Sequence, residues 1–99
     1  MRQPKFIDLR GFLSFQILHE LSKKPLCGDE LAAIIGQRKG AKLTPGTIYP
    51  ALKALRKTKL VQHKKTGRKK MYRLTQTGTN EYKISRDNLE SFFKNLLKK

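Results

Sequence analysis

No aspartate or glutamate occurs in the fifty residues from Leu31 to Asn80, and this limits both the fold of the chain and its partners. The stretch carries thirteen lysines and arginines, so its formal charge is +13. The rest of the chain has ten basic and seven acidic residues and contributes only +3. A surface of one sign repels itself and has to be matched by an anion from outside the chain. Nucleic-acid phosphate is the obvious anion, because its neutralisation releases condensed counterions.

Length and composition indicate one small domain. The chain has 99 residues, of which 37% are hydrophobic, enough for a modest core. No apolar run approaches the roughly 20 residues of a membrane span, and the first ten residues do not resemble a signal peptide. The single cysteine, Cys27, cannot form an internal disulfide. We therefore expect a cytoplasmic protein associated with the nucleoid, since disulfides are rare in that compartment.

The residues that usually carry catalysis or bind metals are few and scattered. Cys27, His19 and His63 do not have the spacing of metal ligands, and there is no phosphate-binding glycine loop. The adjacent carboxylates of Asp29 and Glu30 are explained by a helix N-terminus, with Asp29 as the N-cap. The sequence thus predicts no catalytic residues, no cofactor and no metal.

Two helices are predicted in the first third of the chain. Residues 8–22 have helical periodicity with two apolar stripes. The first stripe is Leu13, Ile17 and Leu21, and the second is Phe12, Phe15 and His19. One stripe can cover the core of the domain, whereas the second has to meet another surface such as a partner subunit. A second helix follows from Asp29, and residues 26–28 form a short extended link.

A third helix is predicted over residues 48–58, after a tight turn at 44–46. With Thr47 as N-cap, Pro50 is the third helical residue, where its missing N–H has no intrahelical partner to lose. Ile48, Leu52 and Leu55 would form the inner face. Tyr49, Lys53 and Arg56 would lie on the opposite side, which suits insertion into a DNA groove.

Residues 60–74 are predicted to form a β-hairpin. The strands are 60–64 and 70–74, and Gly67 lies in the turn. Six basic residues occupy its centre, namely Lys64, Lys65, Arg68, Lys69, Lys70 and Arg73. Edge lysines also prevent aggregation of sheet edges, but six cations exceed that need. Phosphate contact is the reading that we favour over solvated charge.

The last predicted helix is capped by Thr75 and runs to about Lys98. At 1.5 Å per residue it would be about 36 Å long, more than a domain of this size needs. Tyr82, Leu89 and Leu96 repeat every seven residues, and Phe92 and Phe93 lie between the last two. This pattern is typical of a coiled-coil seam and predicts dimerisation.

These elements resemble a known family once their residues are read together. The run from Gly46 to Leu52, followed by Leu55, resembles the recognition helix of the PadR family of transcriptional regulators. Residues 70–75 with Gly78 resemble the second wing strand and the entry to the last helix of that family. Gly28 matches the glycine before its second helix. The resemblance covers about residues 12–82.

The resemblance implies a mainly α fold with a small β-hairpin, a winged helix-turn-helix with a long C-terminal dimerisation helix. The DNA-binding domain would be residues 1–74 and the dimerisation helix residues 75–99. It also implies a homodimeric repressor on an inverted repeat, with the third helix in the major groove and the wing on the backbone. The DNA contacts expected from the resemblance and the charge are Thr47, Tyr49, Lys53, Arg56, Lys64, Lys65, Arg68, Lys69 and Lys70. The expected dimer interface is Phe12, Phe15, Tyr82, Leu89, Phe92, Phe93 and Leu96.

Departures from the family pattern bear on two expectations. Lys59 stands where relatives often have glycine, so it is expected to adopt a positive φ at a helix end. Arg56 replaces a frequent acidic residue and adds charge to the DNA face. In the family the dimer interface can hold a small effector, but the chain has no tryptophan to form the aromatic wall that some relatives use. The sequence does not support an effector.

Other readings stay open. A sequence-neutral architectural DNA-binding protein, or an RNA-binding protein, would rely on charge alone. An adaptor could use the same fold to hold another protein. Tyr49 could be a packing residue with its hydroxyl at the surface, and the stripe of Phe92 and Phe93 could line an effector site instead of an interface.

Overall fold

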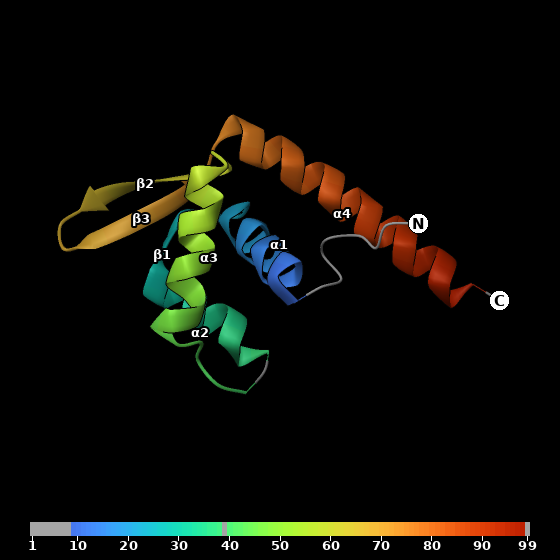
Figure 1. The fold of residues 1–99 in the computed structure, drawn as a ribbon, viewed down its shortest axis with the longest axis horizontal. Coiled ribbons are helices and arrows are strands. Elements are labelled where there is room, and N and C mark those ends of the chain that lie inside the picture. The colour runs from blue at the N-terminus through green and yellow to red at the C-terminus, as the bar shows by residue number, and fades with distance from the viewer. Residues whose placement is uncertain (1–8, 39, 99) are drawn as a thin grey trace.

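Seven elements make up the fold in the computed structural model, which describes residues 9–38 and 40–98. They are α1 (Leu9–Leu21), β1 (Leu26–Cys27), α2 (Gly28–Gln37), α3 (Pro45–Lys57), β2 (Val61–Thr66), β3 (Lys69–Leu74) and α4 (Gln76–Leu97). The first three helices lie together beside a small sheet, and the β2–β3 hairpin and α4 project from this body in different directions (Figure 1). This arrangement confirms the predicted fold class, a winged helix-turn-helix with a long last helix. Asp8, the predicted first residue of α1, lies outside the described residues.

One hydrophobic core joins the helices to the sheet. Its completely enclosed side chains come from α1, α2 and α3: Ile17, Leu31, Ile35, Ile48 and Leu52. Val61, Tyr72 and Tyr82 close the core from β2, β3 and α4. The predicted inner face of α3 is confirmed, and of the two apolar stripes of α1 it is the first, with Ile17 and Leu21, that faces the core.

The sheet has three antiparallel strands in the order β1-β3-β2. The predicted hairpin is confirmed, although its strands run closer to the turn than predicted, so that Thr66 pairs with Lys69. Gly67 adopts φ 64° in the turn, a conformation that glycine allows without steric cost. The predicted extended link is a two-residue strand, with Leu26 paired to Tyr72.

The start of α2 differs from the prediction. Cys27, and not Asp29, is the N-cap residue, and the helix begins at Gly28. The Glu30 carboxylate accepts a hydrogen bond from the Cys27 N–H at 2.9 Å, so the acidic side chain satisfies a helix N-terminus from inside the first turn. Asp29 remains in that turn, where its charge is favourable.

The start of α3 was also predicted wrongly. Thr44 is the N-cap and Pro45 the first helical residue, so the helix begins three residues earlier than a Thr47 cap would give. Proline is favoured at the first helical position because its φ suits the helix and no N–H is needed there. Pro50 therefore lies inside the helix. Its missing N–H leaves the carbonyl of Gly46 without an intrahelical donor, and both residues are exposed to solvent.

Lys59 ends the turn after α3 with φ 63°, as expected from the sequence. Its N–H donates to the carbonyl of Arg56, and the N–H of Leu60 donates to that of Leu55, each at 3.0 Å. These two bonds form a Schellman motif, which glycine usually terminates because a β-carbon is strained at positive φ.

Replacing Lys59 by glycine is therefore expected to raise the free energy of unfolding by about 1 kcal/mol, by removing that strain. Lys57→Gly removes the same charge within α3 and is expected to lower it by about 1 kcal/mol. Urea denaturation of both variants and the wild type measures the two effects. A loss of stability in Lys59→Gly would contradict the expected gain.

The entry to α4 follows the prediction. The Thr75 hydroxyl accepts a hydrogen bond from the Gly78 N–H at 2.9 Å, and it donates to the carbonyl of Lys59 at 2.6 Å. The Thr75 N–H donates to the carbonyl of Leu60 at 3.1 Å. This corner ties the end of the wing to the turn after α3. None of the helices that the structure describes is long and apolar enough to cross a membrane.

The first turns of α4 pack on α1 of the same chain, where two of the residues predicted at the dimer interface, Phe15 and Tyr82, meet each other. Tyr82 is only 7% exposed, and its hydroxyl lies 2.6 Å from Nδ1 of His19. Phe15 is half-buried and stacks on the Tyr82 ring, with 5.6 Å between ring centroids. Tyr82 belongs to the core of the chain and Phe15 packs against that core, so a contact with a second copy would use the part of each side chain that stays exposed.

Candidate nucleic-acid interface

The candidate interface combines the exposed side of α3 with the hairpin beside it (Figure 1). Tyr49, Lys53 and Arg56 are all exposed on α3, as predicted, whereas Ile48, Leu52 and Leu55 are buried. Tyr49 keeps 41% of its surface accessible, so it combines a packed ring with a free edge. The two readings of Tyr49, as a packing residue and as a contact residue, are compatible in this geometry.

The Tyr49 ring lies against the backbone of Gly28 at the start of α2. A β-carbon at Gly28 would come within 2.6 Å of the ring, so only glycine leaves room for this placement. The ring borders a hollow of about 330 Å³ with Arg68, Lys69 and Lys70 of the wing. Burial raises the pKa of Tyr49, and the Asp29 carboxylate nearby raises it further, so the hydroxyl stays protonated at neutral pH and can donate a hydrogen bond.

Lys53 and Arg56 border a second hollow, of about 600 Å³, between the end of α3 and β2. His63 of β2 also lines it and stacks on Tyr72, with 5.2 Å between ring centroids. Burial lowers the pKa of His63, and the positive charges of Arg56 and Lys70 lower it further. The imidazole is therefore neutral at neutral pH, and the positive charge of this hollow comes from lysine and arginine.

Thr47 lies apart from the other predicted contacts on α3. Its hydroxyl is 3.1 Å from that of Thr44, and it borders a hollow shared with Leu13 and Ser14 of α1. The structure thus places Thr47 and Tyr49 at two edges of the exposed side of the helix, and not next to each other.

The wing brings its cations together on two paired strands. Lys64, Lys65, Arg68, Lys69 and Lys70 are all exposed. Lys65 pairs directly with Lys70 across the strands. Like charges directly opposite each other are destabilising. No ion pair involves these five side chains within residues 9–38 and 40–98, so an anion from outside would relieve the repulsion.

Comparison with known proteins identifies the family. The model of the transcriptional regulator PadR-like family matches residues 17–84. The chain belongs to this family. Its fold is the DNA-binding winged helix of PadR-like transcription regulators, which confirms the resemblance that the two motifs indicated. No curated protein matches the chain in sequence.

Solved structures from other organisms share the PadR-like fold. A proposed transcriptional regulator from Thermoplasma acidophilum is 28% identical with a TM-score of 0.76, and the alignment covers 89% of each chain. A PadR family regulator from Clostridium difficile is 26% identical, with a TM-score of 0.75 and coverage of 88% of this chain and 95% of that one. A PadR-like regulator from Bacillus cereus is 25% identical, with a TM-score of 0.74 and coverage of 92% and 96%.

Two residues at this PadR-like interface were missed from the sequence. Lys57 is exposed and borders the same hollow as Lys53, and its position four residues later was the available signal. Asp29 lies beside Tyr49, an acidic group at the edge of a basic surface, and sequence spacing gave no sign of this contact. In the part of the chain that the structure describes, no group of three or more histidine, cysteine or acidic side chains is arranged to hold a metal ion.

Proposed function

We propose that this PadR-like regulator is a sequence-specific repressor that binds an inverted repeat as a homodimer. One observation carries the DNA-binding part of the proposal. The exposed side of α3 and the wing present their cations next to each other, and none of these cations forms an ion pair among the described residues. Such a surface gains most from the phosphates of a duplex. We place the protein on the nucleoid for the same reason.

The two parts of the surface have different roles in this proposal. α3 enters the major groove, where Lys53 and Arg56 read guanine edges and Tyr49 and Thr47 contact the duplex from the two edges of the helix. The wing residues Lys64, Lys65, Arg68, Lys69 and Lys70 hold phosphates. Phosphate contacts fix the position of the protein and carry little sequence information.

The dimer is proposed to form through α1 and the distal part of α4. Leu96 is 62% exposed, and Leu97, Phe93, Ile84 and Phe12 are also exposed apolar side chains. Leu89 and Phe92, which also lie on α4, are half-buried. Exposing five apolar side chains of this size to water costs free energy, and a second copy of the chain would cover them. Residues 75–99 then serve dimerisation, and residues 1–74 bind DNA with the support of Tyr82 from α4.

A two-fold dimer has consequences for the operator. Its two recognition helices would read half-sites about one helical turn apart, roughly 10 bp. A repressor acts by occupying such a site in a promoter. The proposal includes no cofactor and no small-molecule effector.

The dimer is tested by light scattering at micromolar concentration. The wild type is expected to have the mass of two chains, and Phe93→Glu the mass of one, because a charge would be buried in the interface. Ser91→Glu introduces the same charge at another exposed position of α4 and serves as the control. A monomeric wild type would contradict the proposed role of α4.

The function is tested by a competition titration at roughly 150 mM salt. Labelled duplex from upstream of the gene that encodes the protein is challenged with scrambled duplex and with RNA. We expect a preference of at least about 10³ for the upstream duplex, which is typical of specific recognition. Equal competition by all three would favour a sequence-neutral architectural protein, and preferential competition by RNA would favour an RNA-binding protein.

A further inference from the structure

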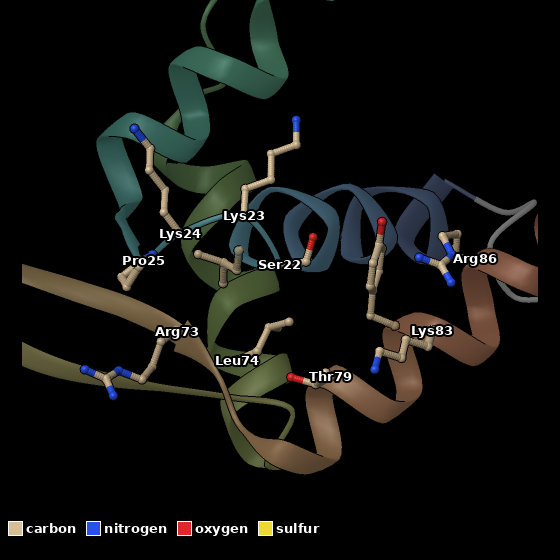
Figure 2. Close-up of a pocket in the computed structure, with 11 residues that line it drawn as sticks. Ser22, Lys23, Lys24, Pro25, Arg73, Leu74, Thr79, Lys83 and Arg86 are labelled. Carbon is tan, nitrogen blue, oxygen red and sulfur yellow. The ribbon is translucent and has the colours of Figure 1, made fainter.

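A second basic surface lies outside the candidate interface. It borders an open hollow of about 670 Å³ between the end of α1, the loop after it, β3 and the first half of α4. Figure 2 shows these elements around the hollow, with basic side chains contributed by all of them except α1. The five cations are Lys23, Lys24, Arg73, Lys83 and Arg86, and no carboxylate lines the hollow.

Arg73 borders this hollow, whereas its neighbour Tyr72 borders the hollow beside Tyr49. Arg73 and Tyr72 are adjacent on β3, and successive side chains of a strand point to opposite faces. None of the DNA contacts expected on α3 and the wing lines this hollow, so a duplex held by those contacts does not use its five cations.

Three of these cations form no ion pair in the described part of the chain, although Lys24 is near enough to Glu30 to help lower the pKa of that carboxyl. Lys23 lies 3.7 Å from Glu20, and Arg86 lies 3.3 Å from Asp87. Lys24, Arg73 and Lys83 form no ion pair there, and all three are exposed. An anion in this hollow would therefore meet these charges without displacing an ion-paired carboxylate.

The floor of the hollow suggests the kind of anion. It is formed by Leu21, Leu74 and Tyr82, and the Tyr82 hydroxyl is already engaged by His19. The described residues thus offer no buried polar group that would select the shape of a small ligand. Long flexible cations around an open surface suit a phosphate chain that is recognised by charge and not by sequence.

We propose that this surface binds the backbone of a second DNA duplex, so that the protein bridges two duplexes. The proposal goes beyond the proposed function and shares with it only the first duplex, held by α3 and the wing. A dimer would present two such surfaces. Two weak contacts on one particle act together, because the second binding event is intramolecular.

The test is a bridging assay at roughly 150 mM salt. Beads carrying an upstream duplex are loaded with protein and washed, and then a labelled scrambled duplex is added. The wild type is expected to retain the labelled duplex. The double variant Lys24→Glu/Lys83→Glu is expected to retain at least about tenfold less, while its affinity for a single upstream duplex changes by less than about threefold.

Lys42→Glu/Lys98→Glu is the control, because it makes the same charge change at exposed positions outside this hollow. It also breaks the 4.0 Å ion pair of Lys42 with Asp29 and changes the end of α4, so its affinity for a single upstream duplex and its mass by light scattering are measured alongside. It is expected to bridge like the wild type, and circular dichroism confirms that both variants are folded. Bridging that is absent in the wild type, or equal in the two double variants, would overturn the proposal. Preferential retention of labelled RNA over labelled duplex would also overturn it.

Failure of the proposed function gives a different result. The upstream duplex would then not retain the protein on the beads in preference to a scrambled one. The bridging assay is then repeated with scrambled duplex on the beads. At least about tenfold less retention of the labelled duplex by Lys24→Glu/Lys83→Glu than by Lys42→Glu/Lys98→Glu would support the second surface, and equal retention would overturn it.

Discussion

Replacing Gly78 by alanine is expected to lower the free energy of unfolding by about 3 kcal/mol, at the upper end of the cost of overpacking. A β-carbon at this position would lie 1.9 Å from the carbonyl oxygen of Leu60. That oxygen is backbone and accepts the N–H of Thr75, so it cannot rotate away as a side chain could. This steric overlap can be relieved only if either α4 or the turn at Lys59 moves.

Gly46→Ala is the matched control for Gly78→Ala. Both glycines lie in helices, but the nearest atom to a β-carbon at Gly46 is 3.9 Å away. Alanine is the better helix former, so this variant is expected to gain about 0.5–1 kcal/mol. Urea denaturation of both variants measures the difference, and similar stabilities would show that the Leu60 contact relaxes without cost.

The elements set by local chemistry could be predicted from the sequence. The Thr75 cap and the Gly67 turn each depend on residues within one or two turns of chain. The positive φ of Lys59 was expected instead from the resemblance, because relatives often have glycine at this position. β1 could not be predicted in this way. It is only two residues long, and its pairing partner Tyr72 is more than forty residues later.

Errors arose where two local rules competed. Thr44 and Thr47 are both acceptable N-caps, and each is followed by a proline, directly in one case and three residues later in the other. The sequence prediction placed Pro50 at the helix start, whereas Pro45 has the better position. For Tyr82, the seven-residue repeat showed that one side of the last helix is apolar but did not show its contact with His19 of α1. Its predicted place at the dimer interface stays a prediction.

The candidate interface was predicted as a set of residues but not as an arrangement. Charge and helix periodicity indicated Lys53, Arg56 and the wing. They did not show that Tyr49 lies over Gly28 beside the wing, or that Thr47 lies at the other edge of α3. These contacts depend on how α2, α3 and the hairpin pack together.

Replacing Lys53 by alanine is expected to reduce specific affinity by about tenfold to a hundredfold, equivalent to 1–3 kcal/mol for one base contact. Affinity for scrambled duplex is expected to fall much less, because one phosphate charge among many is lost. Lys69→Ala removes the same charge from the wing. It is expected to weaken both complexes similarly and to reduce the slope of log K against log salt by about 1.

Fluorescence anisotropy on upstream and scrambled duplexes, at several salt concentrations, separates the two effects. Tyr49→Ala and Arg68→Ala extend the comparison, because the first belongs to α3 and the second to the wing. The two variants of α3 are expected to lower the ratio of specific to non-specific affinity, since a base contact discriminates between sequences and a phosphate contact does not. If all four variants changed this ratio equally, α3 and the wing would act as one electrostatic surface, and the sequence-neutral function would be the better account of the charge.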